Sequence, residues 1–385
     1  MIPSLRRKFN RDWTPAGYGR FLALLEERSG GPPQFRHSET PCFLPAALVD
    51  KMARYGREMV EQLLGDEAYQ RESHAAIPER YRVPNEAARP LFVQADFGLD
   101  EDLEPKLVEI QGFPSLYAYQ PVMAECHREA YGLDLQLASL PGGISLDEYR
   151  RMLGRAIVGD RDPDNVILLE IDPTRQKTRC DFAVTEQWFG VRTVDIRELR
   201  KQGNRLFHGD RPIERIYNRA IVDELERRAI ELPFDFRDDL QVEWAGHPNW
   251  FFRLSKFSLP YLRHVAAPAS QFLDRVDRVE FPERYVLKPL FSFAGLGVIV
   301  GPTAEQIAAI PASRRGEYLL QERVDFQPVV ETPAGMAKIE VRIMYIWLDE
   351  LRAVNTIVRM GRGAQMGVDH NKGLAWVGGS AGFLA

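Results

Sequence analysis

The sequence has 385 residues, of which 45% are hydrophobic and 27% are charged, with a net charge of −5. This composition predicts a globular protein of about two or three domains and argues against nucleic acid as a partner. We expect no membrane span, because no run approaches about 18 apolar residues, and no signal peptide, because the first residues are charged. Three scattered cysteines (Cys42, Cys126 and Cys180) exclude a disulfide framework and favour a reducing, cytoplasmic location.

The first 90 residues predict an N-terminal segment of helices and irregular chain. Residues 1–43 are rich in proline, glycine and charge, and we expect them to be irregular except for a short helix over residues 17–28. From Pro45 to about Tyr69, apolar residues recur at spacings of three and four, which predicts a longer helix. This segment carries no candidate site residue.

Residues 91–120 predict an antiparallel hairpin. LFVQADFGLD (91–100) and residues 106–111 have strand patterns and are joined by a polar turn, which would bring Asp96 close to Glu109 and Gln111. Two carboxylates and an amide oxygen on one face are good ligands for Mg²⁺. The alternative is that these are solvent-facing residues of an amphipathic hairpin. The helical stretch that follows contains Cys126 and His127, an adjacent pair that is a weak catalytic candidate.

Residues 161–245 predict a small open α/β domain. NVILLEIDP (165–173) is a nearly continuous apolar run, as in a buried parallel strand, and a helical stretch, a strand over 191–199 and a hairpin follow it. A third strand is expected at 215–217, with Tyr217 to Arg219 as candidates for a site at its end. The glycine fingerprint of dinucleotide-binding folds is absent.

The stretch YVLKPLFSFAGLGVIVG (285–301) is the strongest candidate for a phosphate site. It combines a strand ending in Lys288, a loop with Gly295 and Gly297, and a second strand. Glycines let backbone N–H groups approach an anion, and the lysine supplies a positive charge. The alternative is a plain β-hairpin with a solvated lysine.

Further strands that contain polar candidate residues are expected in the last part of the chain. EYLLQERVDF (317–326) contains Gln321 and Glu322, and KIEVRIMYIW (338–347) places Arg342 on its polar side, antiparallel to 351–361. Near the C-terminus, Arg359, Arg362 and Lys372 are either partners of a substrate carboxylate or solvated surface charges.

The order of these pieces resembles the ATP-grasp superfamily. The matching pieces between about 248 and 373 are a lysine at a helix start, a strand lysine followed by proline and a glycine loop, a strand ending in Gln-Glu, a strand arginine and a late asparagine. The Asp and Glu-x-Asn strands that close ordinary members are similar to ADFGLD (95–100) and LVEIQGFPS (107–115), ahead of the small α/β domain. This order looks like the circularly permuted branch, similar to the synthetase domain of glutathionylspermidine synthases.

The resemblance implies an α/β (α+β) fold with circularly permuted ATP-grasp architecture, a small open α/β domain and an N-terminal helical segment. The implied division is 1–90 for the N-terminal segment, 91–160 for the permuted metal-binding part, 161–245 for the small domain and 246–385 for the nucleotide-binding lobes. The implied phosphate and adenine contacts are Lys256, Lys288, Ser292, Gly295, Gly297, Gln321, Glu322 and Val324. Arg342 and Lys288 would be catalytic, and the implied magnesium ligands are Asp96, Glu109, Gln111 and Asn371.

The resemblance also implies a reaction, the ligation of a carboxylate to an amine or short peptide, dependent on ATP and Mg²⁺, through an acyl phosphate. One departure matters, because the family has asparagine where this chain has Gln111, which is one methylene longer. The alternatives are a phosphotransferase on the same nucleotide site, a non-catalytic ATP-binding or scaffold protein with a degraded metal site, or an unrelated α/β protein. The sequence does not indicate the oligomeric state or the substrates.

Overall fold

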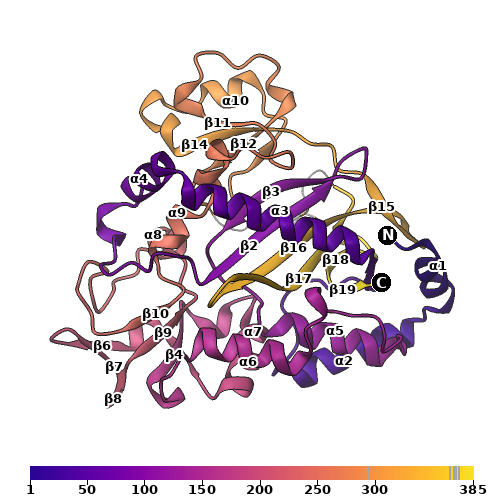
Figure 1. Cartoon of the computed structure of the whole chain (residues 1–385), viewed down its shortest axis with the longest axis horizontal. Coiled ribbons are helices and arrows are strands. Elements are labelled where there is room, and N and C mark those ends of the chain that lie inside the picture. The colour runs from indigo at the N-terminus through magenta and orange to yellow at the C-terminus, as the bar shows by residue number, and fades with distance from the viewer. Residues whose placement is uncertain (293–294, 364–365, 367–370, 372) are drawn as a thin grey trace.

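The protein has a mixed α/β fold, seen in a computed structural model that describes residues 1–292, 295–363, 366, 371 and 373–385. Figure 1 shows a central sheet crossed by α3, an upper lobe with β11, β12, β14 and α10, and a lower part where a small sheet lies near α6 and α7. The helices are α1 (Pro3–Asp12), α2 (Pro15–Arg28), α3 (Ala46–Gly65), α4 (Glu67–Ala75), α5 (Tyr119–Tyr131), α6 (Leu146–Ile157), α7 (Arg179–Phe189), α8 (Val222–Arg227), α9 (Asn249–Arg253) and α10 (Ala304–Ala308). Among the described residues, none of these helices is both long and apolar enough to cross a membrane.

The central sheet joins strands from opposite ends of the chain. Its strand order is β18-β17-β16-β2-β3, with β15 also paired to β16, and its pairs are antiparallel. The strands are β2 (Phe92–Leu99), β3 (Pro105–Gln111), β15 (Pro328–Thr332), β16 (Gly335–Trp347), β17 (Leu351–Gly361) and β18 (Gly378–Ser380). The predicted hairpin over 91–111 is confirmed, and it completes a sheet whose other strands follow residue 327.

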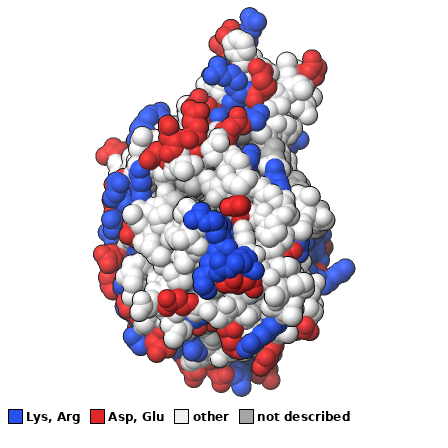
Figure 2. All heavy atoms as spheres, turned by 90° about the vertical axis from the view of Figure 1, so that its right-hand side faces the viewer, with Lys and Arg blue, Asp and Glu red and all other residues white. Residues whose placement is uncertain are grey.

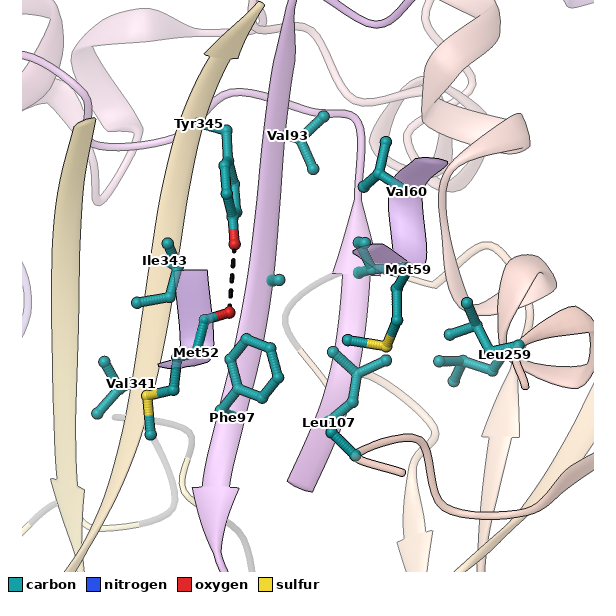
Figure 3. Packing of buried hydrophobic residues seen from close by; sticks show 14 of the residues in the cluster. Met52, Met59, Val60, Val93, Phe97, Leu107, Leu259, Val341, Ile343 and Tyr345 are labelled. Atoms are coloured by element: carbon teal, nitrogen blue, oxygen red, sulfur yellow. Dashed lines mark hydrogen bonds between the residues drawn. The ribbon is translucent and has the colours of Figure 1, made fainter. Parts of the chain in front are cut away.

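One face of this sheet is apolar and is covered by α3. Figure 3 shows Met52, Met59 and Val60 of α3 beside Val93 and Phe97 of β2. Side chains in a strand alternate between faces, so the neighbours Gln94 and Asp96 point to the opposite face. The hydrophobic packing of α3 therefore fixes which face of the sheet carries the polar residues.

A close contact between α3 and β16 depends on a glycine. The hydroxyl of Tyr345 donates to the carbonyl of Ala53 at 2.9 Å and lies 3.4 Å from that of Met52. A Cβ at Gly56 would lie 2.2 Å from the Tyr345 hydroxyl, so a larger residue there would push the helix off the sheet. This contact fixes the distance between α3 and the sheet.

The predicted small α/β unit is also confirmed. A parallel sheet has the order β10-β9-β4-β5, and a three-stranded antiparallel sheet β6-β7-β8 belongs to the same part of the chain. The strands are β4 (Val166–Glu170), β5 (Arg192–Asp195), β6 (Leu199–Gln202), β7 (Arg205–His208), β8 (Arg211–Ile213), β9 (Arg215–Asn218) and β10 (Glu243–Ala245). Arg219, just after β9, donates to the carbonyl of Pro114, which ties this sheet to the segment after β3.

The upper lobe is built on a four-stranded antiparallel sheet. The order is β11-β14-β12-β13, and Val286 pairs with Val300, as the strand, loop and strand pattern predicts. The strands are β11 (Ser270–Phe272), β12 (Tyr285–Pro289), β13 (Ile299–Val300) and β14 (Tyr318–Glu322). This lobe meets the central sheet at β3, because the Lys288 ammonium donates to the carbonyl of Val108 at 2.8 Å.

The first 43 residues are more ordered than predicted. The structure adds α1, which buries Phe9 and Arg6, and β1 (Cys42–Leu44), which pairs in parallel with β19 (Gly382–Leu384). The expected helix over 17–28 starts earlier, at Pro15, because Thr14 caps it by accepting from the amide of Gly17 at 3.1 Å. The proline and charge content concealed these elements because their partners lie outside the elements themselves: Phe9 packs on Phe43 and Tyr131, and β1 pairs with β19.

The long helix predicted from Pro45 to about Tyr69 is two helices. The chain leaves helical geometry at Asp66, where α3 ends and α4 begins. The Asp66 carboxylate accepts from the amide of Tyr69 at 3.0 Å and so caps α4. The apolar spacing continues through the break, which is why periodicity alone does not reveal it.

Candidate functional site

A cavity of about 530 Å³ lies between the polar face of the central sheet and the upper lobe. Its lining includes Phe35, Glu109, Lys256, Lys288, Arg342 and Arg359, which come from widely separated segments of the chain. Most of the candidate residues identified from the sequence therefore meet at this one cavity.

The strand register sets most of the charged residues in two rows across the sheet. In the first row Glu109 of β3 is opposite Asp96 of β2, and Asp96 is opposite Arg342 of β16. In the second row Glu340 of β16 is opposite Arg359 of β17. Directly opposed residues share a face, so these side chains point into the same space. The predicted approach of Asp96 to Glu109 is confirmed, and the solvent-facing alternative is wrong for Asp96, which is 1% exposed.

Asp96 is held by two arginines. Arg342 makes a bidentate contact, from Nε to Oδ1 at 2.5 Å and from Nη2 to Oδ2 at 2.6 Å, and Arg359 also donates to Oδ2. Burial alone would raise the pKa of Asp96, but the two guanidinium groups outweigh burial and hold the pKa below its usual range. Asp96 is therefore a carboxylate in this site, and any cation that binds it competes with two arginines.

Glu109 has looser partners. The Lys256 ammonium lies 3.5 Å from Oε2, and Nη2 of Arg342 lies 3.8 Å from Oε1. Burial opposes ionisation, but Lys256 and the neighbouring cations lower the pKa of Glu109. An ionised carboxylate at these distances has acceptor positions left for a further ligand.

Two lysines at the upper end of the cavity donate to neutral oxygens. The Lys288 ammonium donates to the amide oxygen of Gln321 at 2.6 Å and to the carbonyl of Val108, and that of Lys256 donates to the carbonyl of Ser292 at 2.6 Å. Lys288 is only 4% exposed, so the alternative of a solvated lysine is wrong. Burial lowers the pKa of Lys288 to about 8, with Glu109 acting in the opposite direction.

The glycine loop follows β12 directly. Gly295 and Gly297 both have φ of +74°, a left-handed conformation that side chains disfavour. A Cβ at Gly297 would also lie 2.9 Å from Cγ of Pro289. Gly295 lines the cavity, whereas Ser292 contributes its carbonyl to Lys256, and residues 293 and 294 lie outside the described part of the chain.

The end of β14 forms part of the cavity wall near the two lysines. Gln321, Glu322 and Val324 all line the cavity. The amide of Glu322 already donates to the carbonyl of Ala269 at 2.7 Å, and that of Arg323 to the carbonyl of Arg284 at 2.8 Å. The segment is therefore fixed by backbone hydrogen bonds at Glu322 and Arg323, immediately before Val324.

Two of the expected metal ligands are hydrogen-bonded to other groups of the protein. The amide of Gln111 lies against Arg342, and with its oxygen turned to the guanidinium the contacts are 2.8 Å to Nη2 and 3.0 Å to Nη1. Asn371 is buried, accepts from the amide of Arg362 at 3.0 Å and packs on Gly361, and it is not among the residues that line the cavity. The candidate Lys372 lies outside the described residues.

Two residues of the site were not identified from the sequence. Glu340 is buried beside Arg359, and burial raises its pKa. Gln94 accepts from Nη1 of Arg342 at 2.8 Å and donates to the carbonyl of Ser115 at 2.9 Å. Each stands two positions before a predicted residue on the same strand face, so the alternation of KIEVRIM and FVQADF was a signal that could have identified both.

Two weaker candidates do not join the site. Cys126 and His127 are fully buried, and the His127 ring stacks on Phe21 with centroids 3.9 Å apart. Tyr217 is buried in the core of the lower part, and Arg219 is bonded to Pro114. We interpret both as structural.

The carboxylates present suit a magnesium ion that arrives with a phosphate ligand. Within the described residues, no group of three or more His, Cys, Asp and Glu side chains is placed to hold a metal by itself. Mg²⁺ in nucleotide sites is commonly held by one or two carboxylates together with phosphate oxygens and water. Glu109 and its neighbour Asp96 fit that pattern, and Glu109 has the weaker competing contacts.

The charged groups on the outer surface do not form a wide basic area on the face in Figure 2. Lysine and arginine gather in one group near its centre, and elsewhere on that face both signs are interspersed.

Comparison with protein-family models gives no match, and comparison with curated proteins gives no significant match either. The residues of the cavity are therefore the features of this protein that bear on its function.

Proposed function

We propose that this protein is an ATP- and Mg²⁺-dependent ligase of circularly permuted ATP-grasp architecture, which joins a carboxylate to an amine through an acyl phosphate. One observation carries the proposal: Lys256, Lys288, Arg342 and Glu109 converge on a single cavity although Glu109 lies far from the others in sequence. In an unpermuted arrangement the strand with Glu109 would follow β17, and here β2 and β3 pair with β16 from the other end of the chain. The small parallel sheet lies between these segments in sequence.

The two lysines suit the phosphates of a nucleotide. They are buried cations whose ammonium groups donate to carbonyl and amide oxygens, and Lys256 also lies 3.5 Å from the Glu109 carboxylate. An incoming anion would replace the neutral partners. The loop that contains Gly295, which lines the cavity, would bring backbone N–H groups to a phosphate in the same place. The adenine would lie against Gln321 to Val324, where the amide of Val324 is the donor we assign to the base.

Arg342 would act on the group that is transferred. In the proposed reaction a substrate carboxylate oxygen attacks the γ-phosphorus, ADP leaves, an amine attacks the acyl carbon, and phosphate departs. Such transfers depend on positioning and on neutralising negative charge more than on covalent participation of the protein. Arg342 is fixed by Asp96 and Gln94, so its guanidinium is already oriented before substrates bind. Mg²⁺, held at Glu109 with Asp96 beside it, would add charge neutralisation of the phosphate oxygens.

The test is a calorimetric titration with ATP, with and without Mg²⁺. Lys288→Ala should weaken ATP binding about ten- to a hundredfold, because one charge-assisted contact is worth about 1.5–3 kcal/mol. Glu109→Ala should remove the dependence on Mg²⁺. Lys201→Ala is the matched control, because Lys201 pairs with Asp238 at 2.6 Å, away from the cavity. Unchanged ATP binding by Lys288→Ala would refute the site.

A second candidate is an ATP-binding protein without catalysis. Its support is that Arg342 and Arg359 occupy Asp96, and that the Gln111 amide contacts Arg342. That function predicts nucleotide binding with no turnover for any acid and amine. A phosphotransferase is separated by its products, because only the ligase forms ADP, phosphate and a new amide. The three unpaired, buried cysteines fit the reducing cytoplasm we propose as the location.

A further inference from the structure

One corner of the cavity is apolar although it borders the charged rows of the sheet. Gly379 of β18 is directly opposite Arg359 of β17, so the two residues share one face of the sheet. A ring carbon of Phe35 lies 3.2 Å from the position that a Cβ on Gly379 would take. The Phe35 ring therefore covers Gly379 on the face that carries Arg359, and all three residues line the cavity.

Met123 of α5 extends this apolar corner. It lies about one helical turn after Gln120, whose side-chain amide donates to the carbonyl of Ser380, the residue after Gly379, at 3.0 Å. Met123 is buried, lines the cavity and belongs to the hydrophobic cluster on which Phe35 packs. A triphosphate does not use hydrocarbon contact of this kind, so the corner indicates a second ligand.

Arg359, beside this corner, has donors that its protein partners do not use. Its contacts with Asp96 and Glu340 both come from Nη2. No group in the described part of the chain accepts a hydrogen bond from its Nε or Nη1, and its side chain is 21% exposed. Because a guanidinium has N–H groups on every nitrogen, Arg359 can bind a further anion while it keeps both carboxylates. Arg342, by contrast, uses each of its nitrogens on Asp96 or Gln94.

An apolar corner beside a guanidinium with unused donors matches one ligand chemistry, a carboxylate next to an apolar group. We propose that this corner binds the acid substrate, an apolar carboxylate of the arylalkyl kind, with its carboxylate on Arg359 and its apolar group against Phe35 and Met123. This inference deepens the proposed function and rests on it.

The position of the corner suits the acid substrate. Ile357, which is buried and lines the cavity, stands two positions before Arg359 on the same strand face. Ile357 is also directly opposite Arg342, to which the proposed function assigns the transferred phosphoryl group. A carboxylate bound to Arg359 would therefore lie next to the group that it has to attack.

The carboxylate contact is tested by calorimetric titration with two ligands that differ in charge. With Mg²⁺ and an ATP analogue whose β–γ bond resists hydrolysis, phenylacetate should bind about tenfold or more tightly than the neutral phenylacetamide. Arg359→Lys keeps a charge but loses the planar guanidinium, and it should reduce that ratio by weakening phenylacetate alone. An unchanged ratio, or equal weakening of both ligands, would overturn the assignment of the carboxylate. Arg352→Ala, on the same strand but paired with Glu148, is the control.

The apolar contact gives a second, independent readout. Phenylacetate should bind about tenfold or more tightly than acetate, and Phe35→Ala should reduce that ratio while the preference over phenylacetamide remains. Phe35→Leu should keep part of the ratio, and it replaces the alanine variant if that variant does not fold. Phe207→Ala is the matched control, because Phe207 of β7 is also partly buried but does not line the cavity. The same ratio in wild type and Phe35→Ala would overturn the apolar subsite.

Two further titrations identify the ligand and separate this inference from the proposed function. Tighter binding of 2-phenylethylamine than of phenylacetate would assign the corner to the amine substrate and overturn the proposal. Nucleotide binding without any phenylacetate binding overturns the subsite and leaves the nucleotide site standing. Phenylacetate binding with the expected preferences but no nucleotide binding supports the subsite as a binding site and refutes the ligase. Failure of both ligands to bind refutes both proposals.

Discussion

Two clusters in this molecule combine basic residues with carboxylates but differ in burial and pairing. At the end of the small parallel sheet, Asp172, Asp195 and Glu224 pair with Arg197 and Arg228, and the arginines are 46% and 35% exposed. In the cavity, Lys256, Lys288, Arg342 and Arg359 lie around three carboxylates, those of Asp96, Glu109 and Glu340, and most of these side chains are buried. In the first cluster each arginine pairs with two carboxylates and is in contact with water.

The cavity cluster does not neutralise itself. Its four named cations face three carboxylates, of which Asp96 and Glu340 are both bound by Arg359. Lys288 donates to neutral oxygens rather than to a carboxylate. A buried cation without its own anion is costly to keep, so it marks a ligand site more reliably than the number of charges does.

The largest effect should follow from removing Arg342. Arg342→Met leaves Asp96 with one of its two arginines and Glu109 with fewer cations, in a buried setting, and we expect a loss of about 3–5 kcal/mol in the free energy of unfolding. Urea unfolding followed by tryptophan fluorescence measures it. Adding Asp96→Asn should recover part of the loss, because the buried carboxylate that has only Arg359 left as a partner is then gone. A loss below about 1 kcal/mol would mean that the paired row does not stabilise the sheet.

Lys288 should destabilise the ligand-free protein in a pH-dependent way. Its pKa of about 8 in the folded protein lies below that of an unfolded lysine, about 10.4, so between those values the unfolded chain binds more protons. Folding stability attributable to Lys288 therefore rises as pH increases from about 8 to 10, and below 8 the full cost of the buried charge remains.

Lys288→Met removes this contribution. The difference in unfolding free energy between wild type and Lys288→Met should shift by roughly 1–3 kcal/mol in favour of wild type from pH 7 to pH 10. Chemical denaturation of both proteins at four pH values measures the difference, and titrations common to both cancel. A difference that stays constant with pH would show that burial does not lower the pKa of Lys288, and the contrast between the two clusters would weaken.

A smaller effect should follow from changing Gln111, one of the expected magnesium ligands. Asparagine is one methylene shorter, so Gln111→Asn should withdraw the amide from Arg342 and leave its oxygen beside Glu109, on the same strand face. We expect the Mg²⁺ concentration for half-maximal ATP binding to fall by about two- to tenfold. Gln111→Ala is the control, since it withdraws from Arg342 without supplying an oxygen. Equal behaviour of the two variants would remove Gln111 from the metal site.

Local patterns predicted the strands well and the site in part. Alternation over 338–347 and 351–361 identified β16 and β17 because one face of each is apolar, and the same period placed Asp96 opposite Glu109. α1 was missed because its buried face packs among residues brought together by β1 and β19. Local periodicity reports an element's own faces, not its distant partners.

The pairing of Asp96 with Arg342 lay beyond local patterns. It requires β2 to pair with β16, a contact between residues 246 positions apart, and no hydrophobic period encodes such a choice. The resemblance to a permuted family implied that the two segments share a site, but it assigned Asp96 to a metal. The structure adds that two arginines already hold this carboxylate, which only the side-chain geometry reveals.

The smallest effect should come from the exposed cluster, whose paired arginines should contribute little to stability or ATP binding. Arg197→Ala and Arg228→Ala each remove ion pairs that water and salt already screen, so we expect little or no loss of unfolding free energy, and less still at high salt. ATP binding should not change, because neither arginine lines the cavity. If either variant lost ATP affinity as Lys288→Ala should, the exposed cluster would also contribute to function. Burial of a cation without a carboxylate partner would then no longer distinguish the site.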